Sequence, residues 1–77
     1  MWETIGAEKL SVFSAYYGQA VLAERLGITQ QAVSSWVCGL RRPPPHIRVV
    51  LWRIACIPEH DWLTDDERAE IVRLSAA

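Results

Sequence analysis

Two adjacent glutamines, Gln30 and Gln31, directly follow Thr29, a residue type whose hydroxyl commonly caps the start of a helix. Both are therefore expected in the exposed first turn of a helix. A glutamine amide donates and accepts hydrogen bonds together, so it matches the N6 and N7 atoms on the major-groove edge of adenine. These residues are candidates for reading bases in double-stranded DNA, although solvated glutamines that only favour helix would give the same pattern.

Further polar residues extend this candidate site along the chain. Ser34 and Ser35 lie one helical turn after the glutamines, where short hydroxyls could reach a base edge or a phosphate. Arg41 and Arg42 follow in a loop from which they could bind the DNA backbone on the other side of the groove. An arginine pair that merely increases solubility is the alternative for these two.

Helical spacing of apolar residues recurs along the chain, whereas signals for strands are scarce. The pattern therefore predicts an all-α protein with a single domain over residues 1–77. Five helices and one short helical turn are expected, over residues 4–17, 19–26, 30–38, 45–56, 58–63 and 65–74. In the first helix Leu10, Phe13 and Tyr17 share one face, which is expected to point inward.

Glycine, proline and capping residues indicate where these helices begin and end. Gly18 and Gly27 are expected to end the first two helices, because glycine adopts the left-handed conformation common at a helix C-terminus. The prolines at 43–45 predict an extended loop before the fourth helix. Thr64 and Glu67 form a capping-box pattern at the start of the last helix.

Residues 19–39 combine the features that a helix-turn-helix requires. Ala23 is the small residue needed where the two helices cross, and Gly27 permits the tight turn four residues later. Apolar residues are spaced to face inward from both helices: Leu22, Leu26, Ile28, Val33 and Trp36. The helix that begins at Gln30 is then the one expected to enter the major groove.

The stretch from Leu10 to Leu63 resembles the lambdoid phage repressor/Cro family, also called the xenobiotic-response-element type. Four segments carry the resemblance: Gly18-Gln19-Ala20-x-Leu22-Ala23, Thr29-Gln30-Gln31-Ala32-Val33-Ser34-x-Trp36, Gly39-Leu40-Arg41-Arg42-Pro43, and Ile57-Pro58 through Trp62-Leu63. It implies a compact bundle of about five helices that binds DNA, commonly as a dimer. Residues 64–77 extend beyond the shared core as a C-terminal helical extension.

Gln19 and Thr29 are the candidates for phosphate contacts at helix starts. Gln19 begins the first helix of the motif, where free backbone amides attract anions. The resemblance also places Gln19 at the family's phosphate-contacting glutamine. Together with Arg41 and Arg42, these residues would orient the protein on the duplex without reading its sequence.

Charge is distributed unevenly along a chain whose net charge is −1. Residues 1–57 contain six basic and three acidic residues, whereas residues 58–77 contain two basic and six acidic residues. A basic body can attract DNA even when the total charge is near zero. The acidic stretch from Glu59 to Glu70 would instead suit a basic protein partner, as in an antitoxin that neutralises an enzyme, and the two functions are not exclusive.

Trp52 stands outside the predicted inward stripe of the fourth helix, which is Ile47, Val50, Leu51 and Ile54. An apolar second face of this kind must be covered by the C-terminal helix or by another chain. Candidate residues for a homodimer interface are Trp52, Trp62, Leu63 and Ile71. Three of them, with Val72, could equally cover Trp52 within the chain.

Other classes of function find little support in the sequence. No Ser/His/Asp set, phosphate loop or plausible carboxylate pair is present, so we expect neither an enzyme nor a cofactor. Cys38, Cys56, His46 and His60 lack the paired spacing of zinc ligands, and the two cysteines are expected as reduced thiols. Neither a membrane-spanning run nor a signal-peptide pattern is found, so a cytoplasmic location is expected.

Overall fold

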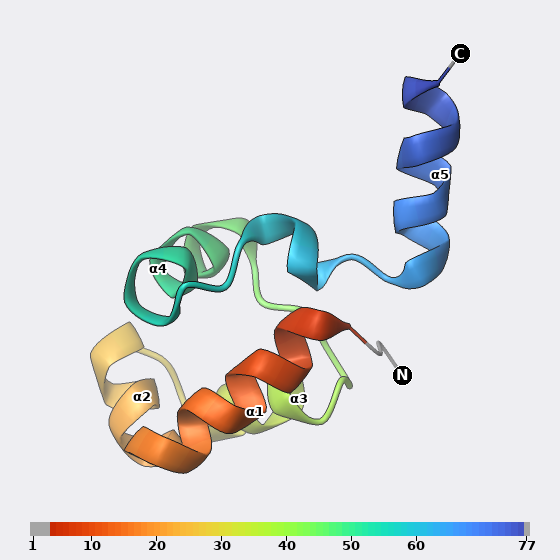
Figure 1. Cartoon of the computed structure of the whole chain (residues 1–77). Helices are drawn as coiled ribbons and strands as arrows, with labels where there is room; N and C mark the ends of the chain where they lie inside the picture. The colour runs from red at the N-terminus through yellow and green to blue at the C-terminus, as the bar shows by residue number, and fades with distance from the viewer. Residues whose placement is uncertain (1–3, 77) are drawn as a thin grey trace.

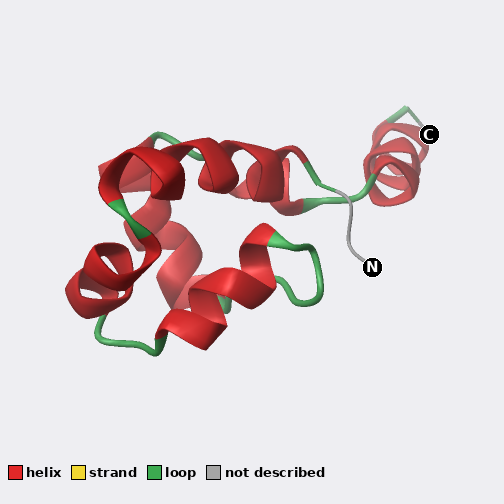
Figure 2. Ribbon diagram, turned by 90° about the horizontal axis from the view of Figure 1, so that it is seen from below, coloured by secondary structure: helices red, strands yellow, loops and turns green. Residues whose placement is uncertain are grey.

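Helices account for the regular structure of the chain, as the computed structural model in Figure 1 shows. The structure describes residues 4–76, and no strand occurs in that range (Figure 2). The elements are α1 (Ile5–Tyr17), α2 (Gln19–Leu26), α3 (Gln30–Val37), α4 (Pro45–Ala55), the 3₁₀ helix η1 (Glu59–Trp62) and α5 (Asp65–Ser75). The predicted all-α class is confirmed.

Local signals place the helix ends within one residue of their predicted positions. Gly27 ends α2 in the left-handed conformation, with φ of 68°, and its amide donates to carbonyls in the last turn. The Thr29 hydroxyl accepts from the Ala32 amide at 3.1 Å, which caps α3. At α5 both hydrogen bonds of the Thr64–Glu67 capping box are present.

The predicted helix-turn-helix packing is present. α2 and α3 pack against each other, and both contact α1. Ala23 is buried, as the small residue at a close helix crossing should be. All the expected inward residues are buried or packed against the core: Leu22, Leu26, Ile28, Val33 and Trp36. This packing sets the angle at which α3 presents its outer face.

The face of α1 that is buried differs from the face predicted from Leu10, Phe13 and Tyr17. Leu10 is buried as expected, but the residues buried beside it are Ala7 and Ser14. Tyr17 is exposed, so its predicted inward position is wrong. Near the start of α1 the bulky indole of Trp62 packs against Gly6, where only a small residue leaves room for it.

Trp62 lies in the core and has only 1% of its surface exposed. A Cβ atom on Gly6 would lie 2.5 Å from Cδ2 of this indole, which shows how closely the α1 backbone approaches it. A side chain enclosed in this way cannot reach a second molecule. The prediction that Trp62 contributes to a dimer interface is therefore wrong, and so is its predicted role as a cover for Trp52.

Replacing Gly6 with alanine should destabilise the fold, although alanine is the better helix former. Over-packing of a core costs about 1–3 kcal/mol, and the helix propensity of alanine returns at most about 1 kcal/mol. We expect a net loss of about 1–2 kcal/mol in the free energy of unfolding, measured by urea denaturation. The loss should shrink when Gly6→Ala is combined with Trp62→Leu, and additive losses in that double-mutant cycle would contradict the contact.

The buried apolar stripe of α4 is narrower than the stripe predicted from the sequence. Ile47 and Leu51 are buried, but Val50 and Ile54, predicted to accompany them, are exposed. The reason is that α4 packs mainly against η1 and the adjoining Ile57, which cover only one side of the helix. Much of the apolar surface of α4 therefore faces outward.

α5 stands away from the body of the molecule and contains no buried residue (Figure 1). The radius of gyration is accordingly 13.0 Å, above the about 11.5 Å expected for a compact chain of this length. Ion pairs fix the base of α5: Arg42 donates to Glu67 at 2.7 Å, and Arg68 donates to the buried Asp61 at 3.3 Å. Because these pairs direct the helix outward, the prediction that Ile71 and its neighbours cover Trp52 within the chain is wrong.

The pKa of the Glu67 carboxyl is lowered, chiefly because the Thr64 backbone N–H donates to it and also because Arg42 does. A carboxyl with a lowered pKa stabilises the fold above its ordinary pKa, and this contribution is lost as the pH falls through the folded value. The attachment of α5 is therefore expected to weaken in acid.

Candidate nucleic-acid interface

The outer face of α3 is polar. Val33 and Trp36 hold the opposite face in the core, so at about 100° per residue Gln31 points directly away from it. Gln30 is also exposed, at the edge of this face, and Ser34 and Ser35 lie on it half-buried. The four candidate base-reading residues thus belong to one helix whose inner side is rigidly packed.

Ser35 is already engaged within the helix. Its hydroxyl donates to the Ala32 carbonyl at 2.7 Å, which leaves its oxygen as an acceptor only. In this rotamer Ser35 can meet a donor such as a base amino group but cannot donate to a phosphate. Ser34 stays a candidate for either kind of contact.

A surface groove of about 560 Å³ runs between the start of α3 and the loop after it. The groove brings together residues that the sequence separates by a whole helix, since Thr29, Gln31 and Ser35 line it together with Arg41 and Arg42. Polar side chains of α3 and two arginines of the following loop therefore border one depression. Gln30 and Ser34 lie beside this groove rather than in its lining.

Arg41 and Arg42 are not equivalent, although both line the groove. Arg41 is exposed. Arg42 is mostly buried and donates to the Glu67 carboxylate at 2.7 Å and to the Trp62 carbonyl at 3.4 Å. Arg42 is therefore part of the attachment of α5, a role that its position in a basic dipeptide did not reveal, and Arg41 is the better placed of the two for a phosphate.

Gln19, the remaining candidate, is the first residue of α2 and is half-buried. Gly18 before it provides no side-chain cap, so the first amides of α2 have no side-chain acceptor from that position. This leaves the start of α2 suited to an anion.

Two other basic residues serve the fold. Arg48 donates from Nε to the Pro43 carbonyl at 2.7 Å and so braces the proline loop that follows α3. Lys9 pairs with the buried carboxylate of Asp61. The burial of Asp61 was not predicted, because in the sequence it is one of several acids in a polar segment.

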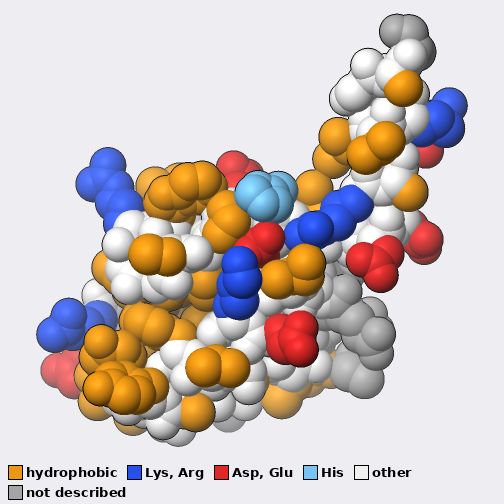
Figure 3. Space-filling model, in the orientation of Figure 1, with side chains coloured by type: hydrophobic (Ala, Val, Ile, Leu, Met, Phe, Trp, Pro, Cys, Tyr) orange, Lys and Arg blue, Asp and Glu red, His pale blue; other side chains and the backbone are white. Residues whose placement is uncertain are grey.

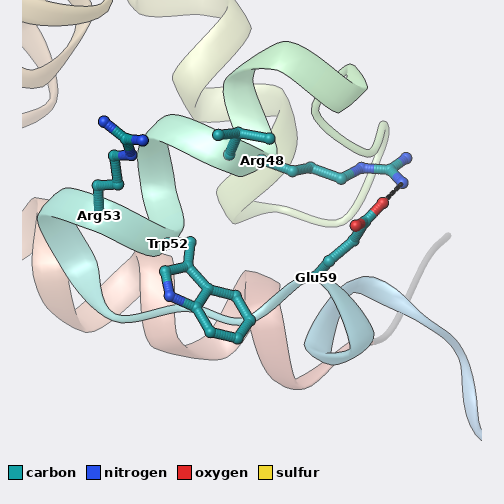
Figure 4. A pocket seen from close by; sticks show the side chains of 5 residues that line it. Arg48, Trp52, Arg53 and Glu59 are labelled. Carbon is teal, nitrogen blue, oxygen red and sulfur yellow. Dashed lines mark ion pairs between the residues drawn. The ribbon is translucent and has the colours of Figure 1, made fainter.

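The Trp52 indole is exposed and borders a second groove with Val49, between Arg53 on one side and the Arg48–Glu59 ion pair on the other (Figure 4). This groove continues toward Leu63, which is half-buried. Two of the four candidate interface residues, Trp52 and Leu63, therefore lie together. Ile71 is exposed on α5.

The described residues bring no three histidine, cysteine or acidic side chains together in a way that could hold a metal ion. Cys38 and Cys56 are free and exposed. Within residues 4–76, no helix has both the length and the apolar character that crossing a bilayer would demand.

Comparisons with protein-family models, with curated proteins and with solved structures found no match to this chain. The resemblance to the phage repressor/Cro family therefore rests on the residues and their arrangement alone.

Proposed function

We propose that this protein binds double-stranded DNA sequence-specifically, as a homodimeric transcriptional repressor of the phage repressor/Cro type. The observation that carries the proposal is the polar outer face of α3, with Gln30 and Gln31 exposed on a helix whose other face is locked into the core by Val33 and Trp36. A rigid support of this kind is what base reading requires, because the side chains must meet base edges at a fixed angle.

The proposed contacts divide into reading and positioning. Gln30 and Gln31 read adenine edges in the major groove, and Ser34 and Ser35 contribute where their hydroxyls reach. Phosphates are bound at both sides of this helix, by the start of α2 with Gln19 and by the groove that Thr29 and Arg41 line.

A homodimer follows from the small size of the reading surface. One α3 of eight residues contacts only a few base pairs, whereas two copies read twice as many. In a two-fold dimer the two α3 helices would lie about 34 Å apart, in successive major grooves. We expect repression by occlusion of polymerase from the bound site.

Selection of bound sequences from a random duplex library tests this function directly. We expect a pseudo-palindrome whose half-sites are centred about 10 base pairs apart. The control is the variant Gln30→Ala/Gln31→Ala/Arg41→Ala, which alters the groove but should preserve the fold. If the wild-type protein enriches no sequence more strongly than this variant does, DNA reading by α3 is contradicted.

Replacing Arg41 with alanine should weaken binding to specific and random DNA by the same factor. In the homodimer Arg41→Ala removes one phosphate contact from each half-site, so the slope of log affinity against log salt concentration should fall by about 1.8, at about 0.9 per contact. Titrations at several salt concentrations measure this slope. Arg73→Ala on α5 is the matched control, because it removes the same charge far from α3 and should leave the slope unchanged. An unchanged slope for Arg41→Ala would exclude a phosphate contact there.

A protein-interaction function is the second candidate, and α5 is the observation that favours it. This helix is acidic and projects into solvent with apolar side chains exposed. An antitoxin that combines DNA binding with neutralisation of a basic enzyme would use such a segment. A different protein that co-purifies at a one-to-one ratio, and is lost when residues 65–77 are removed, would support this function.

A further inference from the structure

α5 exposes apolar side chains that no other part of the described chain covers. Ile71 is 50% exposed, Val72 68% and Leu74 61%. An isolated helix shorter than about 12–15 residues is only marginally stable in water, and α5 has 11 residues. Its capping box helps, but packing against an apolar surface is what stabilises most helices of this length.

α4 offers such a surface on the side opposite its buried residues. Three exposed residues, Pro45, Val49 and Trp52, follow one another at spacings of four and three, which is the spacing of a coiled-coil seam. Val49 and Trp52 are 56% and 54% exposed, and they line the groove shown in Figure 4.

Charge makes the two surfaces complementary. The Trp52 groove is lined by Arg48, Arg53 and Glu59, so its net charge is +1. α5 contains four acidic and two basic residues, so its net charge is −2. Apolar and hydrophobic side chains also gather over α4 and along α5 on the same face of the molecule, on either side of an open space (Figure 3).

α5 cannot reach the α4 of its own chain while its base is fixed. The Arg42–Glu67 and Arg68–Asp61 ion pairs hold the first turn of α5 in the outward orientation, and Thr64 caps the same turn. The complementary α5 must therefore come from another molecule that carries the same helix, which is a second copy of this chain.

Area favours a reciprocal arrangement over a one-way contact. A stable interface buries about 800 Å² on each partner, more than one face of an 11-residue helix provides. When each chain both donates its α5 and offers its α4 groove, the buried area doubles and the contact closes with two-fold symmetry.

We propose that two copies of this chain form a dimer by mutual exchange, in which α5 of each packs along the Val49–Trp52 face of α4 in the other. This interface deepens the proposed function, because it rests on the homodimer and specifies its contact. The α3 groove shares no lining residue with the Trp52 groove, so the exchange leaves the DNA-reading face uncovered.

Sedimentation equilibrium without DNA tests the interface. Ile71→Glu on α5 and Trp52→Gln on α4 should each raise the dimer dissociation constant by about 30-fold or more. Val12→Glu is the matched control, since it places the same charge on an exposed apolar residue of α1 and should leave the constant unchanged. Circular dichroism establishes that each variant is folded.

Mixing the two variants distinguishes exchange from other dimers. A heterodimer of Ile71→Glu with Trp52→Gln contains one contact between an unaltered α5 and an unaltered α4, whereas each homodimer contains none. The mixture should therefore dimerise more tightly than either variant alone. Dimerisation of either variant at the wild-type constant, or a mixture no tighter than its components, would overturn the exchange.

Failure of this interface can be told apart from failure of the DNA-binding function. A wild-type chain that stays monomeric but enriches a single half-site would overturn the exchange and leave base reading by α3 in place. A dimer that shows the mixing effect but selects no DNA sequence supports the interface and contradicts the function.

Discussion

Replacing Trp62 with alanine is expected to lower the free energy of unfolding by about 3–5 kcal/mol, as for other large aromatic side chains in cores. The side chain is 1% exposed and fills the space between α1 and η1. Its removal leaves a cavity beside Gly6 that the small residues of α1 cannot close. Since a single hydrophobic core in a domain of about this size rarely supplies more than about 3–5 kcal/mol, a large fraction of the variant should be unfolded.

Urea unfolding followed by circular dichroism measures this loss, and two variants serve as controls. Trp62→Phe retains most of the buried surface and also removes an indole N–H that has no hydrogen-bond partner in the described chain, so it should cost much less. Trp52→Ala deletes an equal side chain from the surface and should cost less than about 1 kcal/mol at concentrations where the protein is monomeric. Equal losses for Trp62→Ala and Trp52→Ala would contradict the assignment of Trp62 to the core.

The double variant Gln30→Ala/Gln31→Ala should lose about 2–6 kcal/mol of affinity for each operator half-site, since each bidentate contact to a base contributes about 1–3 kcal/mol. The loss should be confined to the specific site, because alanine leaves the phosphate contacts intact. Quantitative titration of the selected operator and of random duplex measures both affinities. The folded structure should be unaffected, as both side chains are exposed.

Gln19→Ala is the matched control for this prediction, because it removes the same side chain from the start of α2. It should weaken specific and random DNA alike, whereas the double variant should change the ratio between them. An equal loss on both kinds of DNA for Gln30→Ala/Gln31→Ala would show that the two amides do not read bases. Each single variant should relax the preference at one base pair only.

The helices and their ends could be predicted because the signals are local. Gly27, Thr29 and Thr64 act on residues within a turn of themselves, so their effect is visible in a short stretch of sequence. The same holds for the pattern of residues 19–39, in which every inward position lies within two adjacent helices or in the turn that joins them. Correct helix ends and a correct motif therefore followed without knowledge of the rest of the chain.

The direction of α5 and the buried face of α1 could not be predicted, because both depend on residues far apart in the sequence. The outward direction of α5 comes from the pairing of Arg42 with Glu67, 25 residues away. Near the start of α1, Trp62 packs against Gly6, a residue that carries almost no hydropathy signal of its own. A large apolar residue such as Tyr17 dominates the pattern, although it contributes nothing to the core.

The sequence predicted which residues belong to the candidate site better than it predicted how these residues are arranged. The exposure of Gln30 and Gln31 followed from their place after Thr29. That Arg41 and Gln31 line one groove depends on how the proline loop folds back, and Arg48 braces that loop through the Pro43 carbonyl. No local pattern distinguishes Arg41 from the neighbouring Arg42.

The position of Arg42 between two surfaces has a thermodynamic consequence. Arg42 lines the α3 groove, and its guanidinium also donates to the Glu67 carboxylate in the first turn of α5. A phosphate bound in the groove would compete with Glu67 for Arg42. Phosphate binding in the groove and the orientation of α5 are therefore coupled by a linkage free energy. Because such linkage is reciprocal, a partner that binds α5 must change the affinity of the groove for its ligand. The ligand of the groove must change the affinity of α5 for that partner by the same factor.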